Sequence, residues 1–121
     1  MTVALWIINI VLALVFVGAG AMKLMKSKEA YVAGGMAWAE ERSPATLKAL
    51  GAAEVLGAVG LIVPLATGIV PVLTPIAALC LCVVMIAATV THLRRKEAFA
   101  PSLVLAVVCV VSAVIALTSV L

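Results

Sequence analysis

Three side chains of this apolar sequence could do acid–base chemistry: Lys23, Glu54 and His92. An ammonium, a carboxylate and an imidazole can hold or transfer protons, and they can orient a carbonyl or hydroxyl oxygen of a ligand. Glu54 lies in the segment LGAAEVLGAVGLIVPL, residues 50–65, where alanine would fill a helix without a charge. A charge at the centre of a membrane helix costs about 2.5–3.5 kcal/mol, and such residues usually have a function. These three residues are therefore the candidate catalytic residues.

The composition is that of a membrane protein. Of the 121 residues, 67% are hydrophobic and 11% are charged, whereas a soluble domain is about half apolar and about a quarter charged. Too little polar surface remains to cover a globule in water. Since the length suits one small domain, we expect a single domain over residues 1–121.

Four segments reach the length of about 20 apolar residues that a membrane-spanning helix needs. They cover residues 3–22, 47–66, 75–93 and 102–121. They lack the alternation of barrel strands, and a helix satisfies its own backbone groups in lipid. We expect an all-α membrane protein, a four-transmembrane-helix bundle. Ala19-Gly20-Ala21 resembles a signal-peptide cleavage site, but no Lys or Arg precedes the first apolar run, so we expect this helix to be retained.

The basic residues predict the orientation of the chain. All eight lie near two connections: Lys23, Lys26, Lys28, Arg42 and Lys48 at the first, and Arg94, Arg95 and Lys96 at the third. The positive-inside rule puts these two connections in the cytoplasm and both termini outside. We expect an integral protein of the bacterial cytoplasmic membrane. Anionic lipid headgroups account for the net charge of +3, so no nucleic-acid partner is expected.

Proline positions predict helix ends. Ser43-Pro44 and Thr74-Pro75 each have the pattern of an N-cap followed by a first helical residue, where the missing N–H of proline is harmless. Pro101 can start the last helix in the same way. Pro64 should kink or terminate the second helix near its outer end.

The first connection, roughly residues 24–46, is long and carries Tyr31, Met36 and Trp38 among charged residues. Gly34-Gly35 interrupts any helix there. Aromatic and basic residues together suit the headgroup zone of a membrane. Two interpretations stay open: a broken interfacial helix over the mouth of the bundle, or a plain solvated turn with aromatic side chains at headgroup level.

Helical spacing predicts which way Glu54 points. Gly51, Gly57 and Ala58 lie three or four residues from it, so they form a strip of small residues on its face. Small residues let another helix approach closely, which turns Glu54 toward the protein interior. Six residues of about 1.5 Å each put Glu54 roughly 9 Å deeper than the headgroup-level Lys48.

Lys23 and His92 end their helices on the same side of the membrane. We expect Lys23 to turn inward and pair with Glu54, with Gly51, Gly57 and Thr89 as candidate ligand-binding residues. The alternatives are that Lys23 reaches out to the headgroups, that His92 is an ordinary interfacial residue, or that the Lys23–Glu54 pair is purely structural. No metal site is predicted.

Three stretches resemble the patterns of the DoxX-like family of small membrane proteins: FVGAGAMKLMKSKEA, LGAAEVLGAVGLIVP and MIAATVTHLRRKEAFAP. The likeness runs along nearly the whole chain, with the same order and spacing of segments. The positions that carry it are Gly18, Gly20, Lys23, Gly51, Glu54, Gly57, Pro64, Ala87, His92 and Pro101. The resemblance implies a four-helix membrane protein. Members of the wider family are linked with quinone, thiosulfate or thiol redox systems and with responses to oxidants or aromatic compounds, but no catalytic motif transfers residue by residue.

Three functions are compatible with these residues. The first is a polar pocket in the membrane that binds a lipid-soluble molecule such as a quinone, in a subunit of or an accessory to a membrane redox system. The second is a membrane-embedded enzyme, an isomerase or hydrolase, that uses Lys23, Glu54 and His92 as acid and base on a lipophilic substrate; whether the protein is an enzyme stays open. The third is a proton-coupled transporter of the small-multidrug type. Small residues on several helices would also permit a homo-oligomer.

Overall fold

The computed structural model describes residues 2–120 of the chain. In this range the chain forms four long helices, which are α1 (Thr2–Met25), α3 (Pro44–Thr67), α4 (Leu73–Arg94) and α5 (Ala100–Val120). Each is long and apolar enough to cross a membrane. Two short segments, α2 (Lys28–Ala33) and the 3-10 helix η1 (Ala37–Glu41), connect α1 to α3. No strand occurs within residues 2–120, so the predicted four-helix fold is confirmed.

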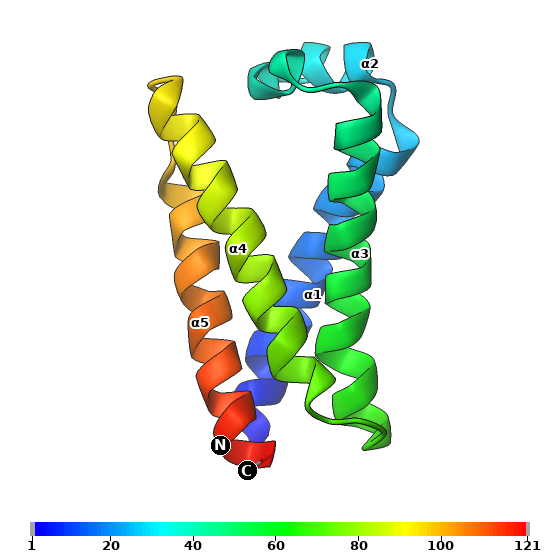
Figure 1. The fold of residues 1–121 in the computed structure, drawn as a ribbon, viewed down its shortest axis with the longest axis vertical. Coiled ribbons are helices and arrows are strands. Elements are labelled where there is room, and N and C mark those ends of the chain that lie inside the picture. The colour runs from blue at the N-terminus through cyan, green and yellow to red at the C-terminus, as the bar shows by residue number, and fades with distance from the viewer. Residues whose placement is uncertain (1, 121) are drawn as a thin grey trace.

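The helices are arranged as two pairs. Helix α1 packs along α3, and α4 packs along α5, with a further contact between α3 and α4. Figure 1 shows that the pairs meet at the end that holds both termini and diverge toward the other end. Between the pairs lies a core of small and aliphatic side chains, among them Leu12, Phe16, Ala58, Leu81 and Met85. The bundle is therefore closed at one end and open at the other.

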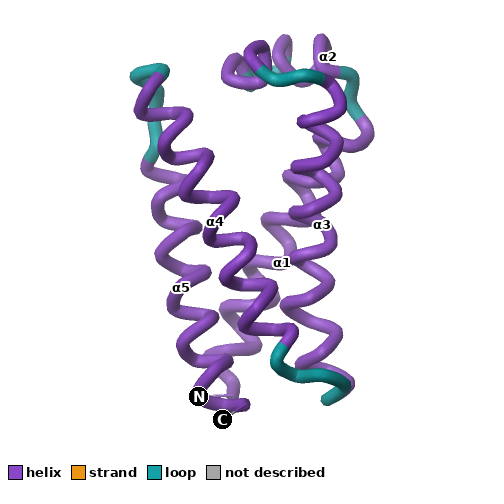
Figure 2. The backbone as a smooth tube through the Cα atoms, in the orientation of Figure 1, coloured by secondary structure: helices purple, strands orange, loops and turns teal. Residues whose placement is uncertain are grey.

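The loops lie at opposite ends of the bundle. In Figure 2 the α1–α3 and α4–α5 connections are at the open end, while the α3–α4 loop lies at the end with the termini. We call the open end, with residues 26–43 and 95–99, the basic end, because every basic residue lies in or beside these two connections. The structure thus confirms that the two connections share one side. That this side is cytoplasmic stays a prediction.

The outward surface of the helices is apolar. Val3, Leu14, Leu56 and Val83 are between 66% and 72% exposed, and large aliphatic side chains cover the outer face of all four long helices. Such a surface is far larger than the apolar patches of soluble monomers. It is the surface of an integral membrane protein surrounded by lipid.

The predicted helix starts are right for α3 and wrong for α4. Ser43 is the N-cap of α3, its Oγ accepts a hydrogen bond from the Thr46 N–H at 3.1 Å, and proline follows at the first helical position. Helix α4 instead begins at Leu73, so Thr74-Pro75 lies inside its first turn. The reason is a turn that begins at Pro71, in which the Thr74 N–H donates a hydrogen bond to the Pro71 carbonyl. A helix leaves its first N–H groups unbonded, so proline is tolerated anywhere in this turn.

Helix α3 does not end at Pro64 but continues to Thr67. It ends at Gly68, whose φ of +69° is the left-handed conformation that glycine adopts easily. Pro64 has no N–H to donate to the carbonyl of Gly60 in the preceding turn. In that turn the Leu61 carbonyl accepts a hydrogen bond from Asn9 Nδ2 on α1 at 2.9 Å.

Asn9 belongs to a buried polar cluster at the closed end. Its Oδ1 accepts a hydrogen bond from Ser112 Oγ on α5 at 2.6 Å, and both side chains are fully buried. Together with the bond to Leu61, this cluster joins α1, α3 and α5. Buried hydrogen bonds of this kind fix the register of membrane helices.

Candidate functional site

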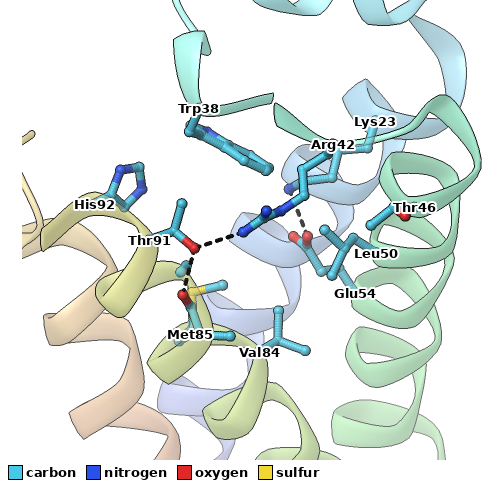
Figure 3. Close-up of a pocket in the computed structure, with 12 residues that line it drawn as sticks. Lys23, Trp38, Arg42, Thr46, Leu50, Glu54, Val84, Met85, Thr91 and His92 are labelled. Atoms are coloured by element: carbon cyan, nitrogen blue, oxygen red, sulfur yellow. Dashed lines mark hydrogen bonds and ion pairs between the residues drawn. The ribbon is translucent and has the colours of Figure 1, made fainter. Parts of the chain in front are cut away.

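A cavity of about 180 Å³ lies at the basic end, where α3 and α4 diverge. Figure 3 shows its two walls, with Glu54 and Leu50 on α3 facing Thr91, Met85 and Val84 on α4. Its polar lining consists of Lys23, Arg42, Thr46, Glu54, Thr91 and His92, with Trp38 above, and its apolar lining consists of Leu50, Val84, Met85, Ala87 and Ala88. An apolar protein cavity of about 150 Å³ can hold benzene, so this volume suits a single ring.

Two facing glycines bring Lys23 and Glu54 together. A Cβ atom added to Gly20 of α1 would lie 2.7 Å from the Gly51 carbonyl oxygen of α3, and one added to Gly51 would lie 2.7 Å from the Gly20 oxygen. Only glycine allows backbones to approach this closely. Helices α1 and α3 run antiparallel, and a Cβ on Gly51 would lie 2.9 Å from Lys23 Cβ, so Lys23 is level with Gly51. Glu54 lies one turn further along α3, and the long Lys23 side chain, which points back toward the start of α1, reaches its carboxylate.

The Lys23 and Glu54 side chains form a buried ion pair. Lys23 Nζ lies 2.6 Å from Glu54 Oε1, and the side chains are only 8% and 2% exposed. The ammonium also faces two aromatic rings, 5.9 Å from the centroid of Tyr31 and 5.8 Å from that of Trp38. Lys23 therefore points inward and does not reach for the headgroups, which confirms the predicted pair.

The second carboxylate oxygen of Glu54 has no partner in this pair. Oε2 is fully buried, and no group in residues 2–120 donates a hydrogen bond to it. A buried acceptor left unsatisfied costs about 1–3 kcal/mol, and more when it is charged. Because Glu54 lines the cavity, a bound molecule can supply the missing donor.

The α1–α3 connection forms a cap over the cavity. Tyr31 and Trp38 pack edge to face with ring centroids 5.9 Å apart, and Tyr31, Ala39 and Leu47 are buried in a small cluster of their own. Helix α2 ends at Gly34, as the Gly34-Gly35 pair predicted. Of the two interpretations of this segment, the structure therefore shows the broken helix over the bundle mouth.

Arg42 joins this cap to α4. It follows η1 directly, and its Nη2 donates a hydrogen bond to Thr91 Oγ1 at 3.0 Å across the cavity (Figure 3). The sequence indicates Arg42 only as one of the basic residues of the first connection. Its place depends on the turn geometry of η1, for which the sequence offers no periodic signal.

His92 lies on the α4 wall, opposite the ion pair. Its ring packs edge to face on Trp38, with centroids 6.4 Å apart, and its Nδ1 lies 3.7 Å from Glu97 Oε1, too far for a hydrogen bond. All three predicted catalytic residues thus line one cavity. Of these three residues only Lys23 and Glu54 are in contact, so neither transfers a proton directly to His92.

The three predicted ligand-binding residues lie in helix contacts and not in the cavity lining. Gly51 faces α1, as described above. A Cβ on Gly57 would lie 2.6 Å from Leu81 Cδ2 of α4, so this glycine serves the α3–α4 contact. Thr89 donates to the Met85 carbonyl at 2.8 Å and shares a hydrogen bond with Ser102 Oγ of α5 at 3.0 Å. Helical spacing shows which residues share a face but not which neighbour covers it.

Comparison with known proteins gives one match. The DoxX-like family matches residues 7–116, which include all four long helices except their outermost residues at the two ends of the chain. No curated protein and no solved structure matches the chain significantly. The match covers the Gly20–Gly51 contact, the Lys23–Glu54 pair and the cap with Arg42. The chain therefore belongs to the DoxX-like family.

Proposed function

We propose that the cavity binds the ring of a lipid-soluble molecule bearing carbonyl or hydroxyl oxygens, such as a quinone. The protein would be a subunit of a membrane redox system or an accessory to one. The observation that carries the proposal is the buried Lys23–Glu54 pair, which forms one end of a cavity in the membrane and leaves Oε2 without a donor.

Size and lining support a ring-shaped ligand. About 180 Å³ is below the 300–1,000 Å³ of typical drug-sized sites, so a single ring fills the cavity and any longer tail lies outside it. Leu50, Val84 and Met85 offer an apolar surface to the ring. The polar groups are few and lie at defined positions, as in most ligand pockets, where apolar residues form the wall and a few polar groups orient the ligand.

Each polar residue has a role in this proposal. The Lys23–Glu54 pair orients one oxygen of the ligand at the buried end. Arg42 has five N–H groups, of which one is bonded to Thr91, so others are directed to a second oxygen near the cap. His92 exchanges protons with the ligand from the α4 wall. The link to redox chemistry rests on the associations of the wider family.

The proposal is tested with a substitution that fills the cavity. Ala88 is half-buried in the cavity wall, so Ala88→Phe should place a ring where the ligand ring binds. Ala53 is exposed on the lipid-facing side of α3, and Ala53→Phe is the matched control. We expect purified parent protein and the control to bind duroquinone, a tetramethylated benzoquinone, saturably in mild detergent, and Ala88→Phe to abolish this binding.

Two results would refute the proposal: no saturable binding to the parent, or equal binding to a folded Ala88→Phe protein. Native mass spectrometry of protein purified in mild detergent provides an independent check, because a bound ring compound should co-purify with the parent and be lost from the filled variant.

A further inference from the structure

We infer that the cavity selects the reduced, hydroxylated form of its ligand, a quinol, over the corresponding quinone. The inference rests on the proposed function and adds the hydrogen-bonding character of the ligand. It follows from what the buried end of the cavity offers to a ligand oxygen.

The buried end offers an acceptor. Lys23 Nζ lies 2.6 Å from Glu54 Oε1, and the carboxylate of such an ion pair can only accept hydrogen bonds. The remaining oxygen, Oε2, is buried and unpartnered among residues 2–120, and its residue, Glu54, is part of the cavity lining. A ligand that meets this oxygen must bring its own O–H or N–H.

Lys23 does not turn the buried end of the cavity from a hydrogen-bond acceptor into a donor. Its ammonium is placed between Glu54 and the rings of Tyr31 and Trp38, with both centroids within 5.9 Å of Nζ. Aromatic faces thus flank the ammonium on sides that the carboxylate does not occupy. A quinone carbonyl at this end would put one acceptor against another, whereas a quinol hydroxyl donates to Oε2.

The other end of the cavity does not discriminate. Arg42 donates to Thr91 with one of its five N–H groups, and the remaining ones can donate to a ligand oxygen. A quinone carbonyl and a quinol hydroxyl oxygen both accept such a bond. The Arg42 end of the cavity therefore leaves the selectivity between redox forms to the Glu54 end.

The expected selectivity is at least about tenfold, because a hydrogen bond to a charged group is worth more than the 1.4 kcal/mol that corresponds to a factor of ten. Preferential binding of the quinol also raises the two-electron midpoint potential of the bound couple. For a tenfold preference this rise is about 30 mV.

The experiment titrates the protein with duroquinone and with durohydroquinone under anaerobic conditions in detergent, by calorimetry. The fully substituted ring cannot add the thiols of Cys80, Cys82 and Cys109, which are free. We expect the parent to bind the quinol at least about tenfold more tightly than the quinone. The dimethyl ether of the quinol, which has the same ring but no donor, should bind no better than the quinone.

Glu54→Gln should reverse the preference. The amide oxygen takes over the contact with Lys23, and the NH₂ group then faces the cavity as a donor for a carbonyl. Glu29→Gln makes the same chemical change at an exposed position in the first turn of α2 and should leave the preference unchanged.

The outcomes separate this inference from the proposed function. Saturable binding with equal affinities for quinone and quinol, or tight binding of the dimethyl ether, would overturn the inference and leave the proposed function standing. A folded Glu54→Gln protein that keeps the parent's preference would also overturn it. Binding of neither redox form would refute the proposed function itself.

Discussion

Removing one partner of the Lys23–Glu54 pair should destabilise the bundle far more than removing both. Lys23→Met leaves a carboxylate, 2% exposed, without its cation, and breaking such a pair costs about 3–5 kcal/mol. Glu54→Leu leaves a buried ammonium that retains its two aromatic contacts, each worth about 0.5–2 kcal/mol, so its loss should be somewhat smaller. The double variant buries two apolar side chains of similar volume, and such replacements are often close to neutral.

The assay is a double-mutant cycle on the free energy of unfolding, measured by denaturant titration in mild detergent with circular dichroism. Because the double variant is close to neutral, the two single losses add up in the coupling energy, and we expect at least about 5 kcal/mol in favour of the pair. Lys48→Met with Glu54→Leu is the control cycle, because the Lys48 ammonium bonds to the Leu24 carbonyl and is exposed, so its coupling to Glu54 should be near zero. A coupling energy near zero for Lys23 and Glu54 as well would contradict the buried pair.

Three further predictions concern the α1–α3 contact, the cap and the orientation in the membrane. Gly51→Ala should destabilise the protein by about 1–3 kcal/mol, because its Cβ would meet the backbone of α1. The control is Gly18→Ala, whose Cβ would have nothing within 4 Å and which should change stability by less than about 1 kcal/mol. Equal effects of the two variants in a thermal melt would argue against the close α1–α3 contact. Arg42→Met should release the cap from α4 and speed hydrogen exchange in η1, with exchange in α5 unaffected. Unchanged exchange in η1 would contradict a role of the Arg42–Thr91 bond in holding the cap. A variant with its native cysteines replaced by alanine should still fold. In this background, cysteines introduced at Ser27 and at Thr67 should label from opposite sides of the membrane, the one at Ser27 from the cytoplasm. Labelling of both positions from one side would contradict the four-span fold.

The sequence predicts the long helices and the buried pair because both depend on local patterns. Hydropathy determines the four spans, and Ser43-Pro44 determines the start of α3. The inward direction of Glu54 follows from small residues within one helical turn of it. Each of these features depends on residues of a single helix, or on small residues that let two helices come into direct backbone contact.

The sequence does not predict which neighbour each face meets. All four long helices are apolar around most of their circumference, so lipid-facing and protein-facing sides differ little in residue type. Thr89 therefore faces α5, and Gly57 faces Leu81, although both share helical spacing with cavity residues. The Asn9–Ser112 bond joins residues 103 positions apart, and no local pattern contains such a contact.

The hydrogen-bonded cluster of Asn9, Leu61 and Ser112 is a fixed point at the closed end of the bundle. It fixes α1, α3 and α5 to one another at one end, so a tilt of the α4–α5 pair about this point would change the width of the cavity. Fourteen residues separate Asn9 from Lys23 along α1, a lever arm of about 21 Å. Over that arm a tilt of about 5° moves the cavity wall by about 2 Å, roughly half the thickness of an aromatic ring. A small rotation at the closed end would thus widen or narrow the cavity at the other.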